Sequence, residues 1–589
     1  MTGKTLVLRA LKDLGVRYLF GYTGGAIMPI FDEIERFDDM TFLMARHEQG
    51  AAFMAQGLTR GALSTDRPEL GVCLSTSGPG AMNLVTGIAD AHMDSVAMLA
   101  ITGQVATGVI ATDAFQESDV VGVMMPICKQ TYMPLSPEEV ESTVHEAFYV
   151  AKTGRGGPVL IDIPKDIQNN ETPADYEFAA ENFTPQLPGF LYSPNPETDA
   201  IKRAADLINR SERPLLFCGH GVINANAGAL LRKFAEKMNI PIAFTLHGLS
   251  ALPLDHPLSL GMMGMHGTVE SNRAIMEADL LIALGMRFDD RVTGKLNEYA
   301  KNADVIHVEI DSSEINKNVA TSVAINADVA RTLEALLDEP MLTYKPRRRW
   351  FSMIEEFRTV MAADLEEEIS RGTGSGGKLL MKSIVHQLSE LTGGRDLIVP
   401  DVGQHQMMAA RFYNYQTENS WFASGGAGTM GASLPMAIGV KLARPNERVW
   451  SISGDGGFQM NIQELGTVME YGIDIKILIL NNGHLGMVRQ WQTFFFDERY
   501  AGTPMRSPNF GLIAEAYGIT YLKVEKLEDV KPALEAAIAH TGAIVVEFVC
   551  EPNEFILPMI PAGGGFNDMI TSFSMNSPDT DEADQGGAS

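Results

Sequence analysis

The sequence predicts an α/β protein with three doubly wound parallel-sheet domains. Many short apolar runs are almost continuously hydrophobic, as in strands that are covered on both faces. Glycine-rich turns and segments of helical periodicity follow these runs repeatedly, which is typical of strand–helix–strand units. The length of 589 residues corresponds to about three or four domains of ~150 residues each.

Twelve apolar runs are predicted to be buried strands. In chain order they are Tyr18–Phe20, Gly71–Leu74, Val96–Ile101, Val159–Ile163, Leu215–Phe217, Ile242–Phe244, Leu280–Leu284, Val305–Val308, Leu397–Val399, Val449–Ile452, Ile475–Leu480 and Ile544–Val549. A further strand is expected around Phe42–Met44, and helical periodicity fills the intervals between strands.

Two segments separate these groups of strands. Residues 169–198 are rich in proline and poor in apolar runs, and residues 340–377 end in the glycine-rich Gly372–Gly377. We therefore expect domains at 1–185, 186–345 and 370–570. The tail at 571–589 is rich in Gly, Ser and Asp, and is expected to be disordered.

Composition argues against several classes of function. The chain has 46 Lys and Arg against 74 Asp and Glu, a formal charge of −28, so no nucleic-acid partner is expected. No apolar run approaches the ~18 residues that span a bilayer, and the N-terminus does not resemble a signal peptide. The four cysteines, Cys73, Cys128, Cys218 and Cys550, lack zinc-type spacing. We expect a soluble cytoplasmic protein with buried thiols and no membrane partner.

A metal-binding and diphosphate-binding site is predicted where two neighbouring strands end. Gly454-Asp455-Gly456-Gly457 follows one strand, and Asn482 follows the next. Parallel strands bring both segments to one edge of the sheet, where α/β proteins bind ligands. Carboxylate and amide oxygens suit Mg²⁺, and the glycines allow backbone N–H groups to approach a diphosphate. The alternative is a tight Asp-Gly turn beside an ordinary loop asparagine.

This arrangement resembles the signature of the thiamin diphosphate enzymes, and most of the chain resembles the acetolactate synthase family within them. Residues 453–492 carry the clearest likeness. The other matching segments are Arg46-His-Glu-Gln-Gly, Thr76-Ser-Gly-Pro-Gly, Thr112-Asp-Ala-Phe-Gln-Glu, Ile161-Asp-Ile-Pro-Lys-Asp, Gly285-Met-Arg-Phe-Asp-Asp-Arg-Val-Thr-Gly and Val402-Gly-Gln-His-Gln-Met. The resemblance implies N- and C-terminal pyrimidine and diphosphate domains that flank a Rossmann-like FAD domain.

The resemblance also implies the residues that bind thiamin diphosphate. Glu48 would bond to N1′ of the aminopyrimidine and tune a base within the cofactor; alone, it reads as a glutamate at a helix N-terminus. The Gly428 carbonyl would accept from the 4′-amino group, and Met430 would hold the cofactor bent. Gly426–Gly431 matches GxGxxG, but we reject a dinucleotide site there. Gln404 and His405 are also implied, and the His484 carbonyl would join Asp455 and Asn482 on Mg²⁺.

The middle domain is implied to carry FAD on loops that follow strand ends. Each of these residues taken alone is an ordinary turn residue, and only the set points to a flavin. The implied contacts are Arg155, Gly219, Gly221, Thr245, Leu246, Gly264, Met265, His266, Gly267, Gly285, Arg287, Asp289, Arg291, Glu309, Ile310 and Asp328. The flavin would be structural, because joining two carbon units needs no net redox change.

The implied activity is decarboxylation of pyruvate and transfer of its two-carbon unit to pyruvate or 2-ketobutyrate, in branched-chain amino acid biosynthesis. The implied substrate residues are Phe115, Gln116, Lys165, Arg291, Met487 and Trp491. A pyruvate oxidase or a sulfoacetaldehyde acetyltransferase is the alternative enzyme, and a non-catalytic nucleotide-binding subunit the alternative from another class. The family places Glu48 of one subunit against Asp455 of another, which implies a homodimer or homotetramer, and a small regulatory subunit is plausible.

Overall fold

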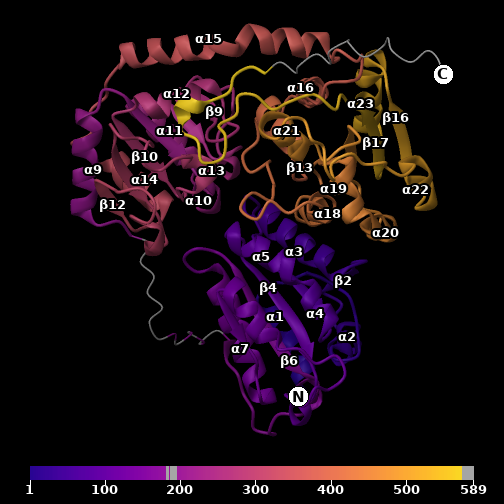
Figure 1. Cartoon of the computed structure of the whole chain (residues 1–589). Helices are drawn as coiled ribbons and strands as arrows, with labels where there is room; N and C mark the ends of the chain where they lie inside the picture. Colours follow the sequence, from indigo (N-terminus) through magenta and orange to yellow (C-terminus); the bar gives the residue numbers. More distant parts are fainter. Residues whose placement is uncertain (181–182, 184, 186, 188–194, 574–589) are drawn as a thin grey trace, which may run out of the picture.

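The computed structural model describes residues 1–180, 183, 185, 187 and 195–573 (Figure 1). The predicted disordered tail therefore lies almost wholly outside the described residues. Three parallel sheets organise the chain, and every strand pair within them is parallel. The predicted fold class is confirmed. No helix in these ranges is long and apolar enough to cross a membrane.

The N-terminal sheet has the strand order β2-β1-β3-β4-β6-β5. Its strands are β1 (Tyr18–Gly21), β2 (Thr41–Met44), β3 (Gly71–Ser75), β4 (Met98–Gln104), β5 (Gln130–Tyr132) and β6 (Pro158–Pro164). Its helices are α1 (Gly3–Asp13), α2 (Met28–Ile34), α3 (Glu48–Ala62), α4 (Pro79–Asn83), α5 (Val85–Met93), α6 (Val120–Met124), α7 (Pro137–Lys152) and α8 (Lys165–Asn169).

The middle sheet has the order β12-β11-β10-β7-β8-β9. Its strands are β7 (Pro214–Cys218), β8 (Ile242–Phe244), β9 (Ser259–Met262), β10 (Leu280–Leu284), β11 (Asp304–Val308) and β12 (Val323–Ile325). Its helices are α9 (Thr198–Arg210), α10 (His220–Asn224), α11 (Gly228–Met238), α12 (Val269–Glu277), α13 (Asp290–Thr293) and α14 (Val329–Asp338). The long α15 (Arg348–Arg371) then leads toward the C-terminal sheet (Figure 1).

The C-terminal sheet has the order β13-β14-β15-β17-β16. Its strands are β13 (Leu397–Pro400), β14 (Val449–Gly454), β15 (Lys476–Asn481), β16 (Thr520–Val524) and β17 (Ile544–Val549). Its helices are α16 (Met381–Thr392), α17 (Gln404–Phe412), α18 (Ser433–Ala443), α19 (Asp455–Met460), α20 (Leu465–Glu470), α21 (Gly486–Phe495), α22 (Phe510–Ala516) and α23 (Val530–Ala539).

Both faces of each sheet are buried, as the continuous apolar runs predict. In the N-terminal sheet, Leu19 and Val72 pack into one apolar cluster with residues of α1 and α7, whereas Phe20 and Cys73 pack into another with α3 and α5. Successive residues of a strand point to opposite faces, so an uninterrupted apolar run requires helices on both.

The N- and C-terminal domains share one core through the crossing of α3 and α18. Glycines let the two backbones approach closely. A Cβ on Gly57 would lie 2.1 Å from the Met436 carbonyl oxygen, and one on Gly439 would lie 2.0 Å from that of Met54. The cluster that surrounds this crossing contains buried side chains from both domains, so the two sheets are packed together and not merely linked.

Candidate functional site

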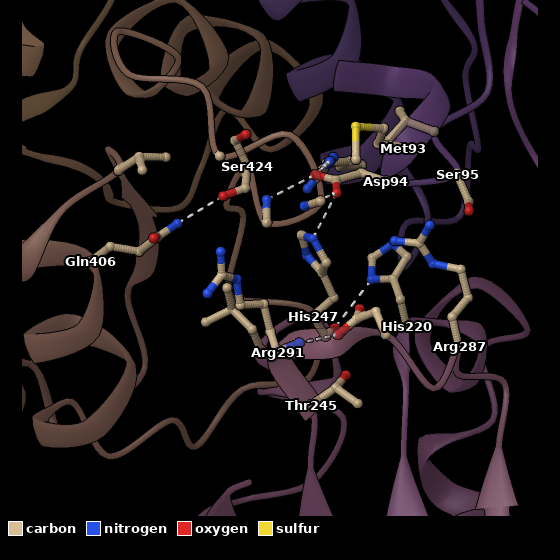
Figure 2. A pocket seen from close by; sticks show the side chains of 18 of the residues that line it. Met93, Asp94, Ser95, His220, Thr245, His247, Arg287, Arg291, Gln406 and Ser424 are labelled. Carbon is tan, nitrogen blue, oxygen red and sulfur yellow. Dashed lines mark hydrogen bonds and ion pairs between the residues drawn. The ribbon is translucent and has the colours of Figure 1, made fainter. Parts of the chain in front are cut away.

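A cavity of about 970 Å³ lies where loops of the three domains meet. The middle and C-terminal domains supply most of its lining from the carboxyl ends of their strands, and the N-terminal domain closes one side through residues such as Asp94 and Ser95 (Figure 2). This is the edge at which α/β sheets bind ligands. One continuous cavity therefore spans the loops assigned to two different cofactors.

The oxygen atoms predicted to bind a metal ion, from Asp455 and Asn482, lie together at the edge of the C-terminal sheet; this part of the site is called here the metal corner. Asp455 begins α19, and its Oδ2 accepts a hydrogen bond from the Ser507 hydroxyl at 2.7 Å. Its Oδ1 is buried and has no partner among the described residues. Burial raises the pKa of Asp455 above its usual value. A buried carboxylate oxygen without a donor is a position that a cation would satisfy.

Asn482 completes this corner from the end of β15. Its Oδ1 accepts from the backbone N–H of His484 at 3.1 Å, and its backbone oxygen accepts from Nδ1 of the same histidine at 2.9 Å. These two bonds fix the turn 482–484, in which Gly483 has a φ of +69°. Asp455 and Asn482 thus lie at one sheet edge as predicted, and their oxygen-rich surroundings fit Mg²⁺.

The glycine-rich turn beside Asp455 packs against a buried carboxylate that sequence reasoning missed. A Cβ on Gly457 would lie 2.2 Å from Oδ2 of Asp401. The other oxygen of Asp401 accepts from the N–H groups of Val402 and Gly431, both at 2.8 Å. Burial raises the pKa of Asp401 to about 7. The only sequence signal for this residue is its place directly after β13.

The loop of Gly428 and Met430 lies opposite this turn, and both residues line the cavity. Gly428 has a φ of +65°, which favours glycine. Gln404 and His405 begin α17 and also face the cavity. The Gln404 amide donates to the Glu554 carbonyl at 2.8 Å, and this hydrogen bond fixes the Gln404 side chain.

Most of the implied flavin residues line the middle part of the same cavity. The lining set is Arg155, Gly221, Thr245, Leu246, Met265, His266, Gly285, Arg287, Asp289, Arg291, Glu309, Ile310 and Asp328. Gly219, Gly264 and Gly267 are not in the lining and act as tight turns; a Cβ on Gly264, for example, would lie 2.4 Å from the Arg291 carbonyl oxygen. His266 Nδ1 is buried without a partner among the residues described, as expected for a wall that faces a polar ligand.

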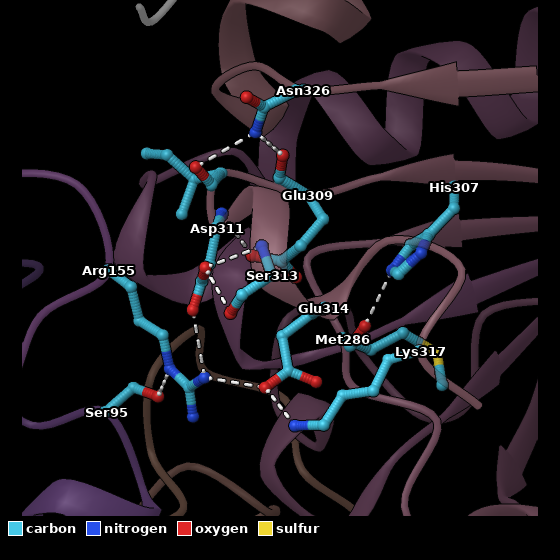
Figure 3. Close-up of polar contacts among 11 residues, drawn as sticks. Ser95, Arg155, Met286, His307, Glu309, Asp311, Ser313, Glu314, Lys317 and Asn326 are labelled. Atoms are coloured by element: carbon cyan, nitrogen blue, oxygen red, sulfur yellow. Dashed lines mark hydrogen bonds and ion pairs between the residues drawn. The ribbon is translucent and has the colours of Figure 1, made fainter. Parts of the chain in front are cut away.

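Arg155 is held by acidic residues of the middle domain. It donates to Asp311 at 3.2 Å and to Glu314 at 3.0 Å, and its Nε donates to the Ser95 hydroxyl at 2.8 Å (Figure 3). Nearby, burial raises the pKa of Glu309 to about 7. Arg155 thus connects the N-terminal and middle domains and also lines the cavity. The carboxylates of Asp311 and Glu314 compensate most of its positive charge.

Glu48 does not line this cavity. It begins α3 with an exposed fraction of 9%, and its Oε2 accepts from the Asn83 amide at 2.9 Å. The chain by itself therefore does not bring Glu48 to Asp455. Glu48 lies beside the turn at Gly78–Gly80: a Cβ on Gly80 would be 3.1 Å from its carboxylate, and one on Gly78 would be 2.6 Å from the Gln116 carbonyl oxygen.

The implied substrate residues form two separate groups. Arg291, Met487 and Trp491 line the cavity. Phe115, Gln116 and Lys165 do not, and lie at the carboxyl edge of the N-terminal sheet. Phe115 is 87% exposed, which is unusual for a large aromatic side chain. The N-terminal sheet edge therefore holds the part of the predicted site that is missing from the cavity.

A carboxylate next to Glu48 provides a test of pH dependence. Glu464 is fully buried; it accepts from the Arg46 N–H at 3.0 Å and from the Thr467 hydroxyl at 2.8 Å. Burial raises its pKa from 4.5 to about 7. Because the folded state holds this proton more tightly, the stabilisation is complete below pH 4.5 and is lost as the pH rises through 7.

We expect Glu464→Gln to remove this dependence. At pH 8 the variant should be more stable than the parent chain by up to about 3 kcal/mol, and at pH 4.5 the difference should vanish. The glutamine oxygen can still accept from Arg46, and its amide can donate to Thr467, which itself donates to the Met44 carbonyl. Urea midpoints between pH 4.5 and 8 measure the effect; parallel curves for the two proteins would contradict it.

Comparison with known proteins identifies the family. Three thiamine pyrophosphate enzyme models match the chain: the N-terminal TPP binding domain at residues 1–123, the central domain at 201–336 and the C-terminal TPP binding domain at 401–548. An acetolactate synthase large subunit from Mycobacterium tuberculosis is 41% identical over 100% of this chain and 94% of its own length.

The chain belongs to the acetolactate synthase family.

Other members of the acetolactate synthase family are similar to this chain over nearly its whole length. The large subunit from Corynebacterium glutamicum is 41% identical over 97% of this chain and 90% of its own length. The chloroplastic acetolactate synthase of Arabidopsis thaliana is 41% identical over 97% of this chain and 84% of its own length. The chain is thus a thiamin diphosphate enzyme, thiamine pyrophosphate being the same cofactor, and the family resemblance of the sequence motifs is confirmed.

Proposed function

We propose that the chain is the catalytic subunit of an acetolactate synthase, which joins the two-carbon unit of pyruvate to a second 2-keto acid in the synthesis of branched-chain amino acids. One observation supports this most strongly. A single cavity is lined by Asn482 and by Gly454, Gly456 and Gly457, which flank the buried Asp455. The same cavity is lined by the middle-domain residues implied to bind flavin, called here the flavin-type wall, and by Arg291 and Trp491. The four buried, unpaired cysteines are in keeping with a reducing cytoplasm.

Different residues in and beside the cavity would bind the metal ion, the two cofactors and the substrate. Asp455, Asn482 and the His484 carbonyl would hold Mg²⁺, and the N–H groups of Gly456 and Gly457 would approach the diphosphate. When bound, thiamin diphosphate supplies the electron sink that allows CO₂ to leave a 2-keto acid. The middle-domain loops would hold FAD as a structural group. The Arg291 guanidinium would pair with the carboxylate of the second keto acid.

A second copy of the chain would complete the site. Glu48 is outside the cavity, and Phe115, Gln116 and Lys165 lie with it at the edge of the N-terminal sheet. We propose that this edge faces the cavity of a partner subunit in a homodimer or homotetramer, so that each site takes residues from two chains. The "large subunit" names of the relatives support a small regulatory subunit as a further partner. The domain limits proposed are 1–185, 186–345 and 370–570.

Product analysis tests the proposed function. The protein is mixed with pyruvate, thiamin diphosphate, Mg²⁺ and FAD without oxygen. Acetolactate, detected as acetoin after acid treatment, is expected, together with a flavin spectrum that does not change. Bleaching of the flavin without acetolactate would instead identify an oxidase, and the absence of both signals would contradict pyruvate as the donor.

The pocket for the second keto acid gives a specificity prediction. Trp491 and Met487 lie on one side of α21, and both line the cavity. Replacing Trp491 with leucine removes apolar contact with the extra methylene of 2-ketobutyrate, which is worth ~10-fold or more in such pockets. We expect the preference for 2-ketobutyrate over pyruvate to fall by about tenfold, measured as the product ratio at equal substrate concentrations. An unchanged ratio would exclude Trp491 from specificity.

A further inference from the structure

Asp94 is a buried carboxylate on which three parts of the chain converge. It follows α5, and its side chain is fully buried. Oδ2 accepts from Arg60 at 2.8 Å and from the Gly425 N–H at 3.1 Å. Oδ1 accepts from the Gly426 N–H at 2.6 Å and lies 3.0 Å from Nε2 of His247 (Figure 2). Burial opposes its charge, but His247 and Arg60 hold the pKa of Asp94 well below its usual range.

The loop that Asp94 holds is the one implied to position thiamin diphosphate. Gly425 and Gly426 lie in the same loop as Gly428 and Met430, and all four residues line the cavity. The same loop is fixed by Asp90, which lies one turn before Asp94 and accepts from the hydroxyl groups of Ser424 and Thr429. The N-terminal domain therefore sets the position of a C-terminal-domain loop through two carboxylates, one on α5 and one directly after it.

His247 reaches Asp94 from the flavin-type wall. It follows Thr245 and Leu246 in a short turn after β8, and its side chain is 16% exposed. Its backbone oxygen accepts from Nδ1 of His220 at 3.1 Å, and both histidines line the cavity (Figure 2). A change in the position of this wall would move the imidazole, and with it the carboxylate that holds Gly425 and Gly426.

We propose that His247 and Asp94 are positioning residues that couple the flavin site to the thiamin diphosphate site. FAD that packs on the 245–247 turn would fix His247, and Asp94 would then hold the 425–430 loop ready for thiamin diphosphate. This inference rests on the proposed function and assigns FAD a specific structural task in it. The two cofactors should bind with positive coupling, and by linkage each should strengthen binding of the other by the same factor.

The experiment measures this factor directly. Calorimetric titration gives the Kd of thiamin diphosphate, with Mg²⁺ present, for the FAD-free protein and for the protein saturated with FAD. We expect FAD to lower this Kd at least about fivefold, the lower end of typical coupling factors. The reciprocal titration, in which flavin fluorescence gives the Kd of FAD with and without thiamin diphosphate, should return the same ratio.

Three variants separate coupling from general loosening of the loop. His247→Leu removes the polar contact with Asp94 and should bring the ratio close to one, whereas His247→Gln keeps an N–H group near this carboxylate and should restore it. Gln406→Ala is the matched control, because its amide holds the same loop at the Ser424 carbonyl, 2.8 Å away, from within the C-terminal domain. It should weaken thiamin diphosphate binding equally with and without FAD, so that the ratio is retained.

The outcomes distinguish this inference from the proposed function. If FAD binds but the parent ratio is one, or if His247→Leu keeps the parent ratio, the coupling is overturned while the proposed function stands. If FAD does not bind to the parent protein at all, the flavin part of the proposed function fails and this inference fails with it. Loss of the ratio in His247→Leu together with its return in His247→Gln supports the coupling.

Discussion

Glu48→Gln is expected to lower kcat by about 10²–10⁴-fold, the range typical of a lost acid–base group, while thiamin diphosphate and Mg²⁺ remain bound. Glu48 is buried at the start of α3 and is held by Asn83, so glutamine fits in its place. Only the ability of the carboxyl group to share a proton with the cofactor is lost. The exchange of the C2 proton of bound thiamin diphosphate in D₂O should slow in parallel, and unchanged exchange would contradict this role.

Two controls accompany this variant. Glu141→Gln changes another buried glutamate of the same domain, on α7 and paired with Arg9, and should leave turnover close to that of the parent. Mixing Glu48→Gln with Asp455→Ala tests whether sites are shared between chains. After random exchange of subunits, half of the dimers carry one intact site, so about a quarter of the parent activity should return. No recovery despite exchange would place both residues in one chain's site.

Asp455→Ala is expected to weaken Mg²⁺-dependent binding of thiamin diphosphate by at least about 100-fold, because outer-shell changes alone cost about 10–100-fold. Ser507→Ala is the graded control: it removes only the 2.7 Å hydrogen bond to Oδ2, and should have a smaller effect. Equilibrium dialysis with Mg²⁺ measures both. Equal affinity in Asp455→Ala and the parent would exclude Asp455 as a metal ligand.

The stability of Asp455→Ala should fall below that of the parent only when the ligands are present. In the part of the chain that the structure describes, Oδ1 of Asp455 is buried without a partner, and burial raises the pKa of the carboxyl group. Without ligands, removal of this carboxyl group should therefore not lower the unfolding temperature. With Mg²⁺ and thiamin diphosphate the parent gains stability by binding, and the variant should not. A variant that is unstable in both states would indicate a purely structural aspartate.

The sequence predicts the interior of each sheet better than its edges. All twelve predicted runs overlap strands. Eleven of these strands lie inside a sheet, where they are covered on both faces, and the twelfth, β13, is an edge strand that is fully buried. Four strands without a predicted run are β5, β9, β12 and β16, and each is an edge strand. Edge strands have one neighbour and are partly exposed, so β16, with the sequence TYLKV, lacks the signal.

The candidate site, too, could be predicted only in part from the sequence. Asp455 and Asn482 were predictable because each directly follows a strand, and the order of strands alone brings them to one edge. Asp94, His247 and Asp401 were not, since their roles depend on contacts between elements that are distant in the sequence. The proposed pairing of Glu48 with Asp455 of a second copy rests on the family resemblance alone, because no pattern in one chain encodes the surface of a second copy.

The close crossing of α3 and α18 has a consequence for how the protein folds. Because the glycines allow the two helices to pack closely, neither the N-terminal nor the C-terminal domain can bury its part of their common core alone. The outer domains should fold and melt as one cooperative unit although a whole domain separates them in the chain. The middle domain thus interrupts, along the chain, a unit that the two outer domains form in space. Fragments cut between domains should aggregate unless the two outer pieces are refolded together.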